Sequence, residues 1–480
     1  MSRSTTSCSP SGRQRAGQSL PEVGHRVVRL QRTARVWRLT ARNGIRYTVH
    51  RVRRRLAGGE RREEMDNEFA IRTSEDVARE LGQMKGALMK FGQLLSFIVE
   101  ALPEDAQKAL ASLQADAPPM SPGAAARVVR DELGNDPERV FLDWSATPVA
   151  AASVGQVHRA VTHDGRRVAV KVQYPGVDAA IEGDLDNAEG LYRLAGAFAL
   201  KGLDAKGLVD ELRARMREEL DYTLEAANQT MMATYFEEHP FVRIPAVDPA
   251  TSTRRVLTTE WVDGVSFDRF REGAGIDERR RAGETIWRFA QHAVHHLGAF
   301  NGDPHPGNYL FGRDGSVTFL DFGLVKRWTG GEWAQLEPSL DAIVVHRDPE
   351  RLVAAMEDIG FLRVGHGLAA QAVYDYVSAP YEPYLVDEFT FTRTFVRDTL
   401  GRVIDVKGPH AEVIAKLNMP PSFVILDRVV WGVSAILGKL EVTGPWRSML
   451  LEYRLGAPSV TDLGRAEAAW SAARTATASR

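Results

Sequence analysis

Apolar residues recur at helical spacing along the segment 75–100, and this spacing predicts an amphipathic helix there. Three prolines, at positions 118, 119 and 122, end that region, and the pattern beyond them predicts another helix over about 123–133. Further helical patterns run from Val177 to Phe198 and from about Leu203 to Phe236. The residues that define the first helix are Val77, Leu81, Met84, Leu88, Phe91, Leu94 and Leu95.

Strand patterns are concentrated between the predicted helices. Alternating apolar residues predict the strands Val154–Val161 and Arg167–Val172, joined by a turn at 163–165. A third strand is predicted over Arg254–Thr259, and from about Ser266 to Tyr453 the pattern is mainly helical. Strands in one segment and helices in the next predict an α+β fold that is rich in helix.

An alanine-rich loop precedes the first of these strands and resembles the nucleotide loop of protein kinases. The pattern G-x-G-x-x-G-x-V reads here as A-x-A-x-x-G-x-V, and Lys171 follows its last valine by fourteen residues, where a kinase carries the lysine of its third strand. Alanine restricts a backbone that glycine would leave free, so we expect an unusual nucleotide pose. The candidate nucleotide-binding residues of this loop are Ala150, Ala151, Ala152, Ser153, Val154, Gly155, Gln156 and Val157.

A second group of residues has the spacing of a kinase catalytic loop. The segment Asp303–Asn308 reproduces D-x-x-x-x-N, and Asp321 begins a D-F-G sequence thirteen residues later. Asp303 is the candidate base or orienting carboxylate, and Asn308 and Asp321 are candidate Mg²⁺ ligands because hard cations prefer oxygen. These fragments, in this order, predict a protein-kinase-like two-lobed fold that binds ATP and Mg²⁺. No A-P-E sequence follows, which disfavours a peptide substrate.

These patterns divide the chain into five parts. We expect a basic, partly disordered arm over 1–65, a helical extension over 66–140, a kinase-like small lobe over 141–265, a kinase-like large lobe over 266–455 and a C-terminal tail over 456–480.

Charge and composition restrict the setting in which this enzyme would act. The chain has 44% hydrophobic residues and a net charge of −2, which excludes global disorder. Residues 1–60 nevertheless contain fourteen arginines and only two acids, so the arm is either attracted to an anionic membrane surface or simply solvated. Cys8 is the single cysteine and no apolar run approaches about 18 residues, so we expect a cytoplasmic protein, peripheral at the inner face of the membrane at most.

Two further motifs, K-x-G-Q at Lys90–Gln93 and E-x-D at Glu219–Asp221, complete a resemblance to the UbiB family of atypical kinase-like proteins, also called AarF or ADCK. The resemblance covers roughly residues 70–450. It implies that Lys90 and Gln93 lie on a helix that covers the nucleotide pocket and that Glu219 and Asp221 hold this helix. It also implies an ATPase or kinase-like activity that supports quinone metabolism, such as ubiquinone biosynthesis, or other isoprenoid-lipid metabolism at a membrane.

The same resemblance selects Glu225 as the partner of Lys171. Helical spacing alone would place Glu218, Asp221 and Glu225 on one face, with Glu219 turned by about 100° from Glu218. The residues Glu260 and Val262 are expected at the hinge, where adenine would bond the backbone.

One residue departs from the family pattern, and several histidines could be interpreted as metal ligands or catalytic groups. Many members have a histidine where this chain has Asn301. His292 and His296 have the i, i+4 spacing of a zinc pair, but they lack a third ligand and packing is the favoured interpretation. His305 is expected to cap its loop rather than to catalyse.

The sequence therefore predicts an atypical kinase or ATPase with ATP and Mg²⁺ as cofactors and a small-molecule or lipid substrate. Lipid-biosynthesis enzymes are candidate partners, and nucleic acid is disfavoured because the arginines of the arm lack groove-reading elements. The alternative is a pseudokinase-like protein that binds nucleotide or lipid and regulates partners with little turnover. Alanines at the loop favour the alternative, whereas Lys171, Asp303, Asn308 and Asp321 favour catalysis.

Overall fold

The computed structural model describes residues 121–152, 154–177, 217–405, 408–418 and 421–478. The basic arm, the helix predicted over 75–100, all but Val177 of the helix predicted from Val177 to Phe198, and the site residues Lys90, Gln93 and Ser153 lie outside these residues. The described residues belong to one compact unit of the chain.

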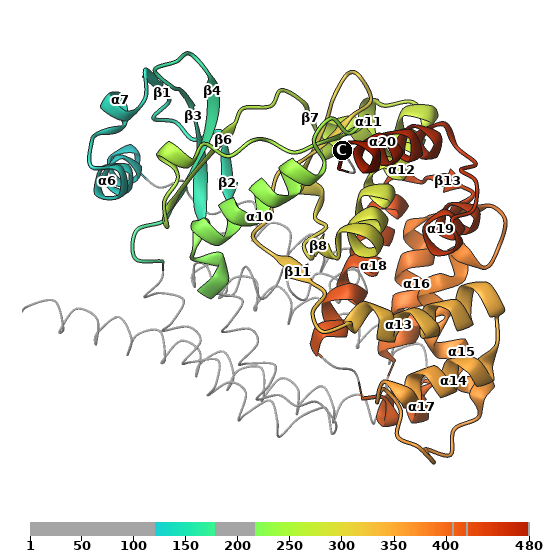
Figure 1. Ribbon diagram of the computed structural model, residues 1–480. Helices are drawn as coiled ribbons and strands as arrows, with labels where there is room; N and C mark the ends of the chain where they lie inside the picture. Colours follow the sequence, from blue (N-terminus) through green and yellow to red (C-terminus); the bar gives the residue numbers. More distant parts are fainter. Residues whose placement is uncertain (1–120, 153, 178–216, 406–407, 419–420, 479–480) are drawn as a thin grey trace, which may run out of the picture. The chain divides into compact units, whose positions relative to one another are not determined.

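A five-stranded antiparallel sheet forms the small lobe (Figure 1). The strands lie in the order β1-β3-β4-β6, and β2 pairs with β3. The predicted hairpin is confirmed, since β3 and β4 pair from Gly155↔Gln173 to Val161↔Arg167 around the turn at Gly165. The elements of this lobe are α6 (Pro122–Leu133), α7 (Pro137–Val140), β1 (Asp143–Trp144), β2 (Ala150–Ala152), β3 (Gly155–Val161), β4 (Arg167–Gln173), α10 (Tyr222–Tyr235), η1 (Pro249–Thr251) and β6 (Val256–Glu260). The strand β5 (Val242–Arg243) pairs instead with β10 (Val317–Phe319) of the large lobe.

Alternation along β4 decides which side chains face the core and which face the site. Val168, Val170 and Val172 are buried and pack in one cluster with Val128 of α6. Because successive strand residues point to opposite faces, Lys171 points to the other face of the sheet, the face on which α10 lies (Figure 1).

The continuous helix predicted over 203–236 is wrong, because the chain leaves the helical conformation at Leu220 and Asp221. Asp221 is extended, at φ −118° and ψ 92°, and its carboxylate accepts the N–H of Thr223 as the N-cap of α10. The N–H of Tyr222, the residue after Asp221, donates to the carbonyl of Arg254 at 3.0 Å. Because Arg254 lies just before β6, this bond attaches the start of α10 to the sheet. The shared face expected for Glu218, Asp221 and Glu225 is therefore also wrong.

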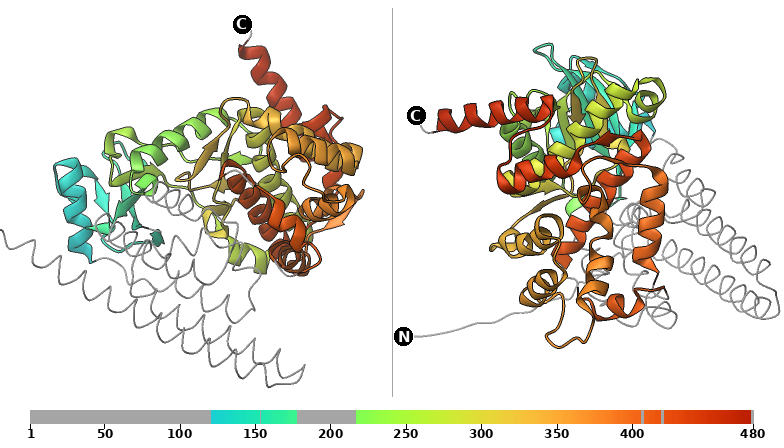
Figure 2. Two further views of the ribbon diagram at one scale, coloured as in Figure 1. Left: turned by 90° about the horizontal axis from the view of Figure 1, so that it is seen from below. Right: turned by 90° about the vertical axis from the view of Figure 1, so that its right-hand side faces the viewer.

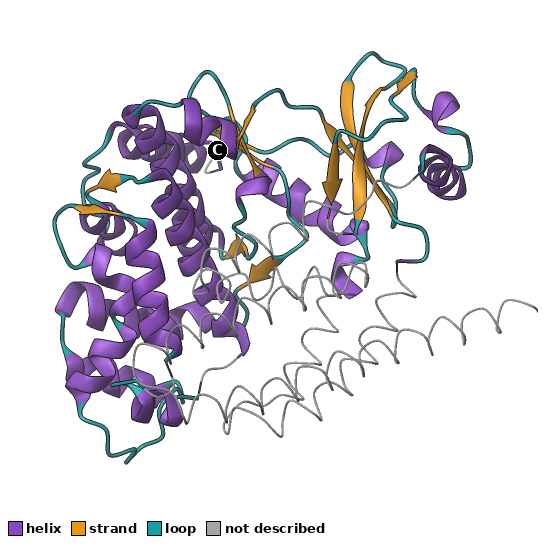
Figure 3. Cartoon of the chain, turned by 180° about the vertical axis from the view of Figure 1, so that it is seen from behind, coloured by secondary structure: helices purple, strands orange, loops and turns teal. Residues whose placement is uncertain are grey.

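The large lobe is mainly helical, as predicted, and also contains several short strands (Figures 2 and 3). Its elements are β7 (Val265–Ser266), α11 (Phe267–Gly273), α12 (Ile276–His292), η2 (Ala293–Leu297), β8 (Ala299–Asn301), η3 (Pro306–Asn308), β9 (Tyr309–Phe311), β10 (Val317–Phe319), β11 (Val325–Arg327), α13 (Glu332–Asp341), η4 (Ala342–His346), α14 (Pro349–Asp358), α15 (Ala370–Val377), η5 (Ala379–Tyr384), β12 (Phe389–Thr390), α16 (Arg393–Ile404), α17 (Ala411–Lys416), α18 (Pro421–Leu440), β13 (Thr443–Gly444), α19 (Trp446–Leu455) and α20 (Asp462–Ala478).

Helix α18 packs against both α12 and α16 in the core of this lobe. Its buried residues include Val429, Ile436 and Leu437, but Arg428 interrupts the apolar surface. In the part of the chain that the structure describes, no helix is both long and apolar enough to cross a membrane.

The C-terminal helix α20 is attached through a buried arginine on α12. The guanidinium of Arg288 is fully buried and bonds Glu452 of α19 at 2.9 Å and Glu467 of α20 at 3.1 Å. On the same helix, the indole of Trp470 donates to the carbonyl of Glu237 just beyond α10. Because α20 touches residues of both lobes, it fixes the end of α10 against the large lobe.

Gly155, at the third glycine position of the nucleotide loop, is required because the backbone of Val172 approaches it closely. A Cβ at Gly155 would lie 2.2 Å from the carbonyl oxygen of Val172 and 3.0 Å from the hydroxyl of Tyr222. We therefore expect Gly155→Ala to lower the free energy of unfolding by about 1–3 kcal/mol, measured by urea denaturation. Gly123→Ala is the control, since nothing lies within 4 Å of a Cβ at Gly123 in α6. Equal stability of the two variants would contradict this explanation of Gly155.

Candidate functional site

Lys171 and Glu225 form a buried ion pair between β4 and α10. The ammonium Nζ lies 2.9 Å from Oε1 and 2.8 Å from Oε2 of Glu225, so both carboxylate oxygens accept from it. The ring of Tyr222 lies beneath the ammonium, with its centroid 4.9 Å away, and adds a cation–π contact. The lysine and glutamate that the sequence paired are thus brought together, and they fix α10 relative to the sheet.

Asp321 adds a second carboxylate to the same ammonium. Its Oδ2 lies 3.6 Å from Nζ of Lys171, and its Oδ1 accepts the N–H of Gly323 at 2.9 Å. The neighbouring Phe322 is fully buried, and its carbonyl accepts from the side chain of Asn228 on α10. These contacts point Asp321 toward the lysine and the helix that carries Glu225.

The side chains around Lys171 include more acidic than basic groups. Burial alone would lower the pKa of Lys171, but the carboxylates of Glu225 and Asp321, with a smaller effect of Glu219, raise that pKa well above its ordinary value. Burial raises the pKa of Glu225, and Asp321 adds to this effect while Lys171 opposes it. The carboxylates of Glu219, Glu225 and Asp321 outnumber the single ammonium of Lys171, so this group of side chains attracts a cation.

Glycine at position 323 keeps open the space between these carboxylates. A Cβ there would lie 3.1 Å from Oε1 of Glu219, 3.3 Å from Oδ1 of Asp321 and 3.8 Å from Oε2 of Glu225. Glu219 therefore faces the site, although the predicted continuous helix would have turned it away. The break at Asp221 is what changes its direction.

Asn301, Asp303 and Asn308 form a hydrogen-bonded unit with the D-F-G segment. The side chain of Asn301 donates to the carbonyl of Asp321 at 2.6 Å and accepts the N–H of Asp303 at 2.8 Å. The amide of Asn308 donates to the carbonyl of Asp303 at 3.1 Å. Asn301, which the sequence marked only as a departure from the family pattern, thus connects the catalytic loop to Asp321.

The carboxylate of Asp303 is held by an arginine that sequence reasoning missed. Nη2 of Arg428, on α18, donates to Oδ1 of Asp303, and both side chains are at most 10% exposed. Nη1 of Arg428 is buried and has no hydrogen-bond partner within the described residues. The pair is 125 positions apart in sequence, so no local motif could have revealed it.

The alanine-rich loop is the edge strand β2, which pairs with the beginning of β3. Ala150 and Ala151 are exposed and Ala152 is half-buried. The side chain of Gln156 is buried and bonds Nε2 of His158, while Nδ1 of His158 bonds the carbonyl of Ser145. Burial lowers the pKa of His158. Gln156 is thereby used in packing, and the exposed alanines form the accessible surface of the loop.

The predicted hinge follows directly after β6. The N–H of Glu260 donates to the carbonyl of Ala246, and the N–H of Trp261 donates to the carbonyl of Arg167. No partner is found for the N–H of Val262 in the described part of the chain. The backbone N–H of Val262 is therefore available to a hydrogen-bond acceptor.

The donor set fits a hard divalent cation. Asp321 offers a carboxylate and Asn308 an amide whose nitrogen is already used within the loop. Mg²⁺ is commonly held by one or two protein oxygens together with substrate phosphates, which matches this pair. Gly323 preserves the room that such an ion would need.

The remaining candidates have packing or capping contacts. Asp221 is the N-cap of α10. Nδ1 of His305 accepts the N–H of Gly307, which confirms its capping role. His292 bonds the hydroxyl of Tyr235 on α10, and His296 packs against His292 with ring centroids 4.7 Å apart.

Fold and site together define a protein of the kinase-like class, with a lysine–glutamate pair, a D-F-G aspartate and a D-x-x-x-x-N loop. The family model of the ABC1 atypical kinase-like domain matches residues 112–356. The chain belongs to this family, the one also called UbiB or AarF, and the kinase-like α+β fold predicted from sequence is confirmed.

Relatives in plants, animals and bacteria show how far the similarity extends. The chloroplastic Protein ACTIVITY OF BC1 COMPLEX KINASE 8 of Arabidopsis thaliana is 32% identical over 57% of this chain and 37% of its own length. The mitochondrial Atypical kinase COQ8B of Rattus norvegicus is 29% identical over 70% of this chain and 63% of its own length. A solved structure of the Rv3197–erythromycin complex from Mycobacterium tuberculosis has a TM-score of 0.61 and 32% identity, and the match covers 82% of this chain and 98% of that one. This chain thus spans less than two thirds of the two named kinases.

The buried pair of Asp303 and Arg428 leads to a stability prediction. Arg428→Met should remove the guanidinium that bonds this buried carboxylate and lower the free energy of unfolding by about 3–5 kcal/mol. The double variant Asp303→Asn/Arg428→Met should recover much of that loss, as measured by chemical denaturation.

Arg397→Met is the matched control, because Arg397 pairs with Asp398 at the surface, where both side chains are more than half exposed. Its effect should stay within about 0.5 kcal/mol. Equal losses for Arg428→Met and Arg397→Met, or no recovery in the double variant, would contradict a buried pair.

Proposed function

We propose that this protein binds Mg-ATP and acts as an atypical kinase or ATPase that supports quinone or isoprenoid-lipid metabolism at a membrane. The observation that supports it best is the position of Lys171, which contacts Glu225 and lies 3.6 Å from Asp321. A kinase needs its lysine–glutamate pair in place and its D-F-G aspartate in position to hold Mg²⁺.

Each residue of the site has a role in this proposal. Lys171 binds the α/β-phosphates, Glu225 orients its ammonium, and the N–H of Val262 bonds adenine. Asn308 and Asp321 would hold Mg²⁺, which neutralises charge on the triphosphate when bound. Asp303 orients a hydroxyl or water and accepts its proton at a carboxylate oxygen. Buried Arg428 limits the directions in which that carboxylate can point.

The membrane and lipid part of the proposal has its own basis. It rests on membership of the ABC1 family, on relatives of chloroplasts and mitochondria, and on the arginine-rich arm 1–60. An arm of this kind would attract the protein to anionic lipid, and lipid-biosynthesis enzymes would be its partners there.

The second candidate is a pseudokinase-like protein that binds nucleotide or lipid and regulates partners with little turnover. The ion pair between Asp303 and Arg428 favours it, because an arginine bound to the carboxylate competes with the proton that a base must accept. Alanine at positions 150 and 152 favours it as well. ATP binding without measurable hydrolysis or phosphoryl transfer would decide for this candidate.

Asp321 provides the test of the main proposal. Asp321→Asn should remain folded but lose at least about tenfold of its Mg²⁺-dependent affinity for ATP, because one carboxylate beside the triphosphate is removed. Calorimetric titration with ATP, with and without Mg²⁺, measures this effect. Asp277→Asn is the control, since that carboxylate is 84% exposed on α12. Unchanged Mg-ATP affinity of Asp321→Asn would refute the assignment.

The basic arm generates a separate prediction for the membrane. Removal of residues 1–60 should weaken sedimentation with anionic vesicles, and added salt should weaken sedimentation of the full chain, since each surface arginine contributes about 1 kcal/mol that ions screen. Vesicle binding that survives the removal would assign membrane contact to other parts of the chain.

A further inference from the structure

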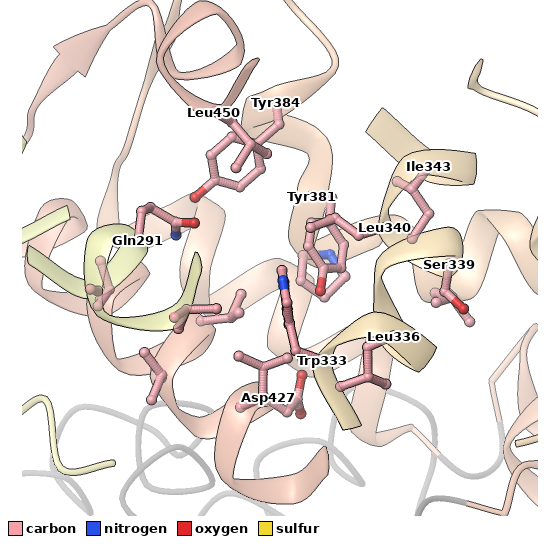
Figure 4. Close-up of a pocket in the computed structure, with 18 of the residues that line it drawn as sticks. Gln291, Trp333, Leu336, Ser339, Leu340, Ile343, Tyr381, Tyr384, Asp427 and Leu450 are labelled. Atoms are coloured by element: carbon pink, nitrogen blue, oxygen red, sulfur yellow. The ribbon is translucent and has the colours of Figure 1, made fainter. Parts of the chain in front are cut away.

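A cavity of about 140 Å³ lies within the helices of the large lobe (Figure 4). Helices α13 and α18 form two of its walls, and η5 contributes a third. Its surface is mainly apolar, with Leu336 and Leu340 from α13 and Val430 and Val433 from α18. An engineered cavity of about 150 Å³ holds a benzene molecule, so this one accommodates a group of about that size.

The carboxylate of Asp427 lies among the apolar side chains that line this cavity. Asp427 of α18 lines the cavity together with Trp333 and Tyr381 (Figure 4). Burial raises the pKa of Asp427 to about 6, although the indole of Trp431 opposes the change. Placing a carboxylate among apolar side chains costs free energy unless a partner compensates it.

Within the described residues, no cationic side chain pairs with Asp427. Arg454 reaches the cavity wall from outside, where its guanidinium lies 5.8 Å from the ring of Trp333, but it is paired with Glu337 and Asp341. His295 lines the cavity, and burial lowers its pKa to about 3, so the imidazole is neutral.

A second polar group in the wall, the buried hydroxyl of Ser339, lacks a hydrogen-bond partner in the described structure. Ser339 lies on α13, the helix that also provides Trp333 (Figure 4). An apolar cavity with one carboxylate that lacks a cationic partner and one unsatisfied hydroxyl has the character of a ligand site, since such sites combine apolar walls with a few polar groups.

We propose that this cavity is a binding site for a small hydrophobic amine, whose ammonium pairs with Asp427 and whose apolar part fills the space between α13 and α18. The aromatic rings of Trp333 and Tyr381 add surfaces on which a cation is stabilised. An alcohol would lack the charge that Asp427 selects, and a carboxylic acid would be repelled.

This site is separate from the nucleotide pocket, although both use α18. Arg428 bonds Asp303 in the catalytic loop, whereas its neighbour Asp427 lines the cavity. The proposal does not depend on ATP binding, and its test involves no nucleotide.

Calorimetric titration of the full chain with 2-phenylethylamine, 2-phenylethanol and 3-phenylpropanoate, at pH 7.5, tests the proposal. These probes share one ring and differ in charge. The amine should bind at least about tenfold more tightly than the alcohol, as expected for a charge-assisted hydrogen bond, and the acid should not bind. Equal affinities, or no binding of the amine, would overturn the proposal.

Asp427→Asn should reduce the affinity for the amine to that for the alcohol, while Asp375→Asn, which removes an exposed carboxylate on α15, should leave both affinities unchanged. A photoreactive azide of 2-phenylethylamine, used on the unmodified chain, keeps the test independent of how the variants fold. It should label residues of α13, α18 or η5, and labelling confined to segments that do not line the cavity would refute this site.

Discussion

One ammonium group shared among carboxylates holds the candidate site together. Lys171 lies on β4, Glu225 on α10 and Asp321 in the D-F-G segment, so a single cation connects the sheet, a helix and the large lobe. Burial makes each of these charges costly when alone. The ion pairs therefore fix the positions of the three elements relative to one another. The excess of negative charge favours the binding of a further cation.

Helix α18 applies a second constraint, at the catalytic loop. Arg428 bonds Asp303, and one turn later Gly432 allows the loop to approach, since a Cβ there would lie 2.3 Å from Cγ of Pro304. Asp427, the residue before Arg428, lines the cavity on another side of the helix. A single helix thus contacts both Asp303 and the site that we propose for an amine.

Local patterns in the sequence were sufficient for much of the fold and part of the site. Alternation along 154–172 predicted the β3–β4 hairpin, and strand geometry places Lys171 opposite Val170 and Val172. Spacing gave Asp303, Asn308 and Asp321, whereas the choice of Glu225 came from family resemblance. The break before α10 was missed because it depends on two hydrogen bonds. The carboxylate of Asp221 accepts the N–H of Thr223, and the N–H of Tyr222 donates to the carbonyl of Arg254, which is distant in sequence. Arg428 and the cavity were missed for the same reason, since both depend on residues that meet only after folding.

The central claim is that Lys171, held by Glu225 and Asp321, binds the phosphates of ATP. The affinity of Lys171→Met for Mg-ATP, measured by calorimetry against the unmodified chain, tests it most directly. Loss of a charge-assisted contact to phosphate should weaken binding by at least about tenfold. A folded Lys171→Met variant that binds Mg-ATP as tightly as the unmodified protein would contradict the account.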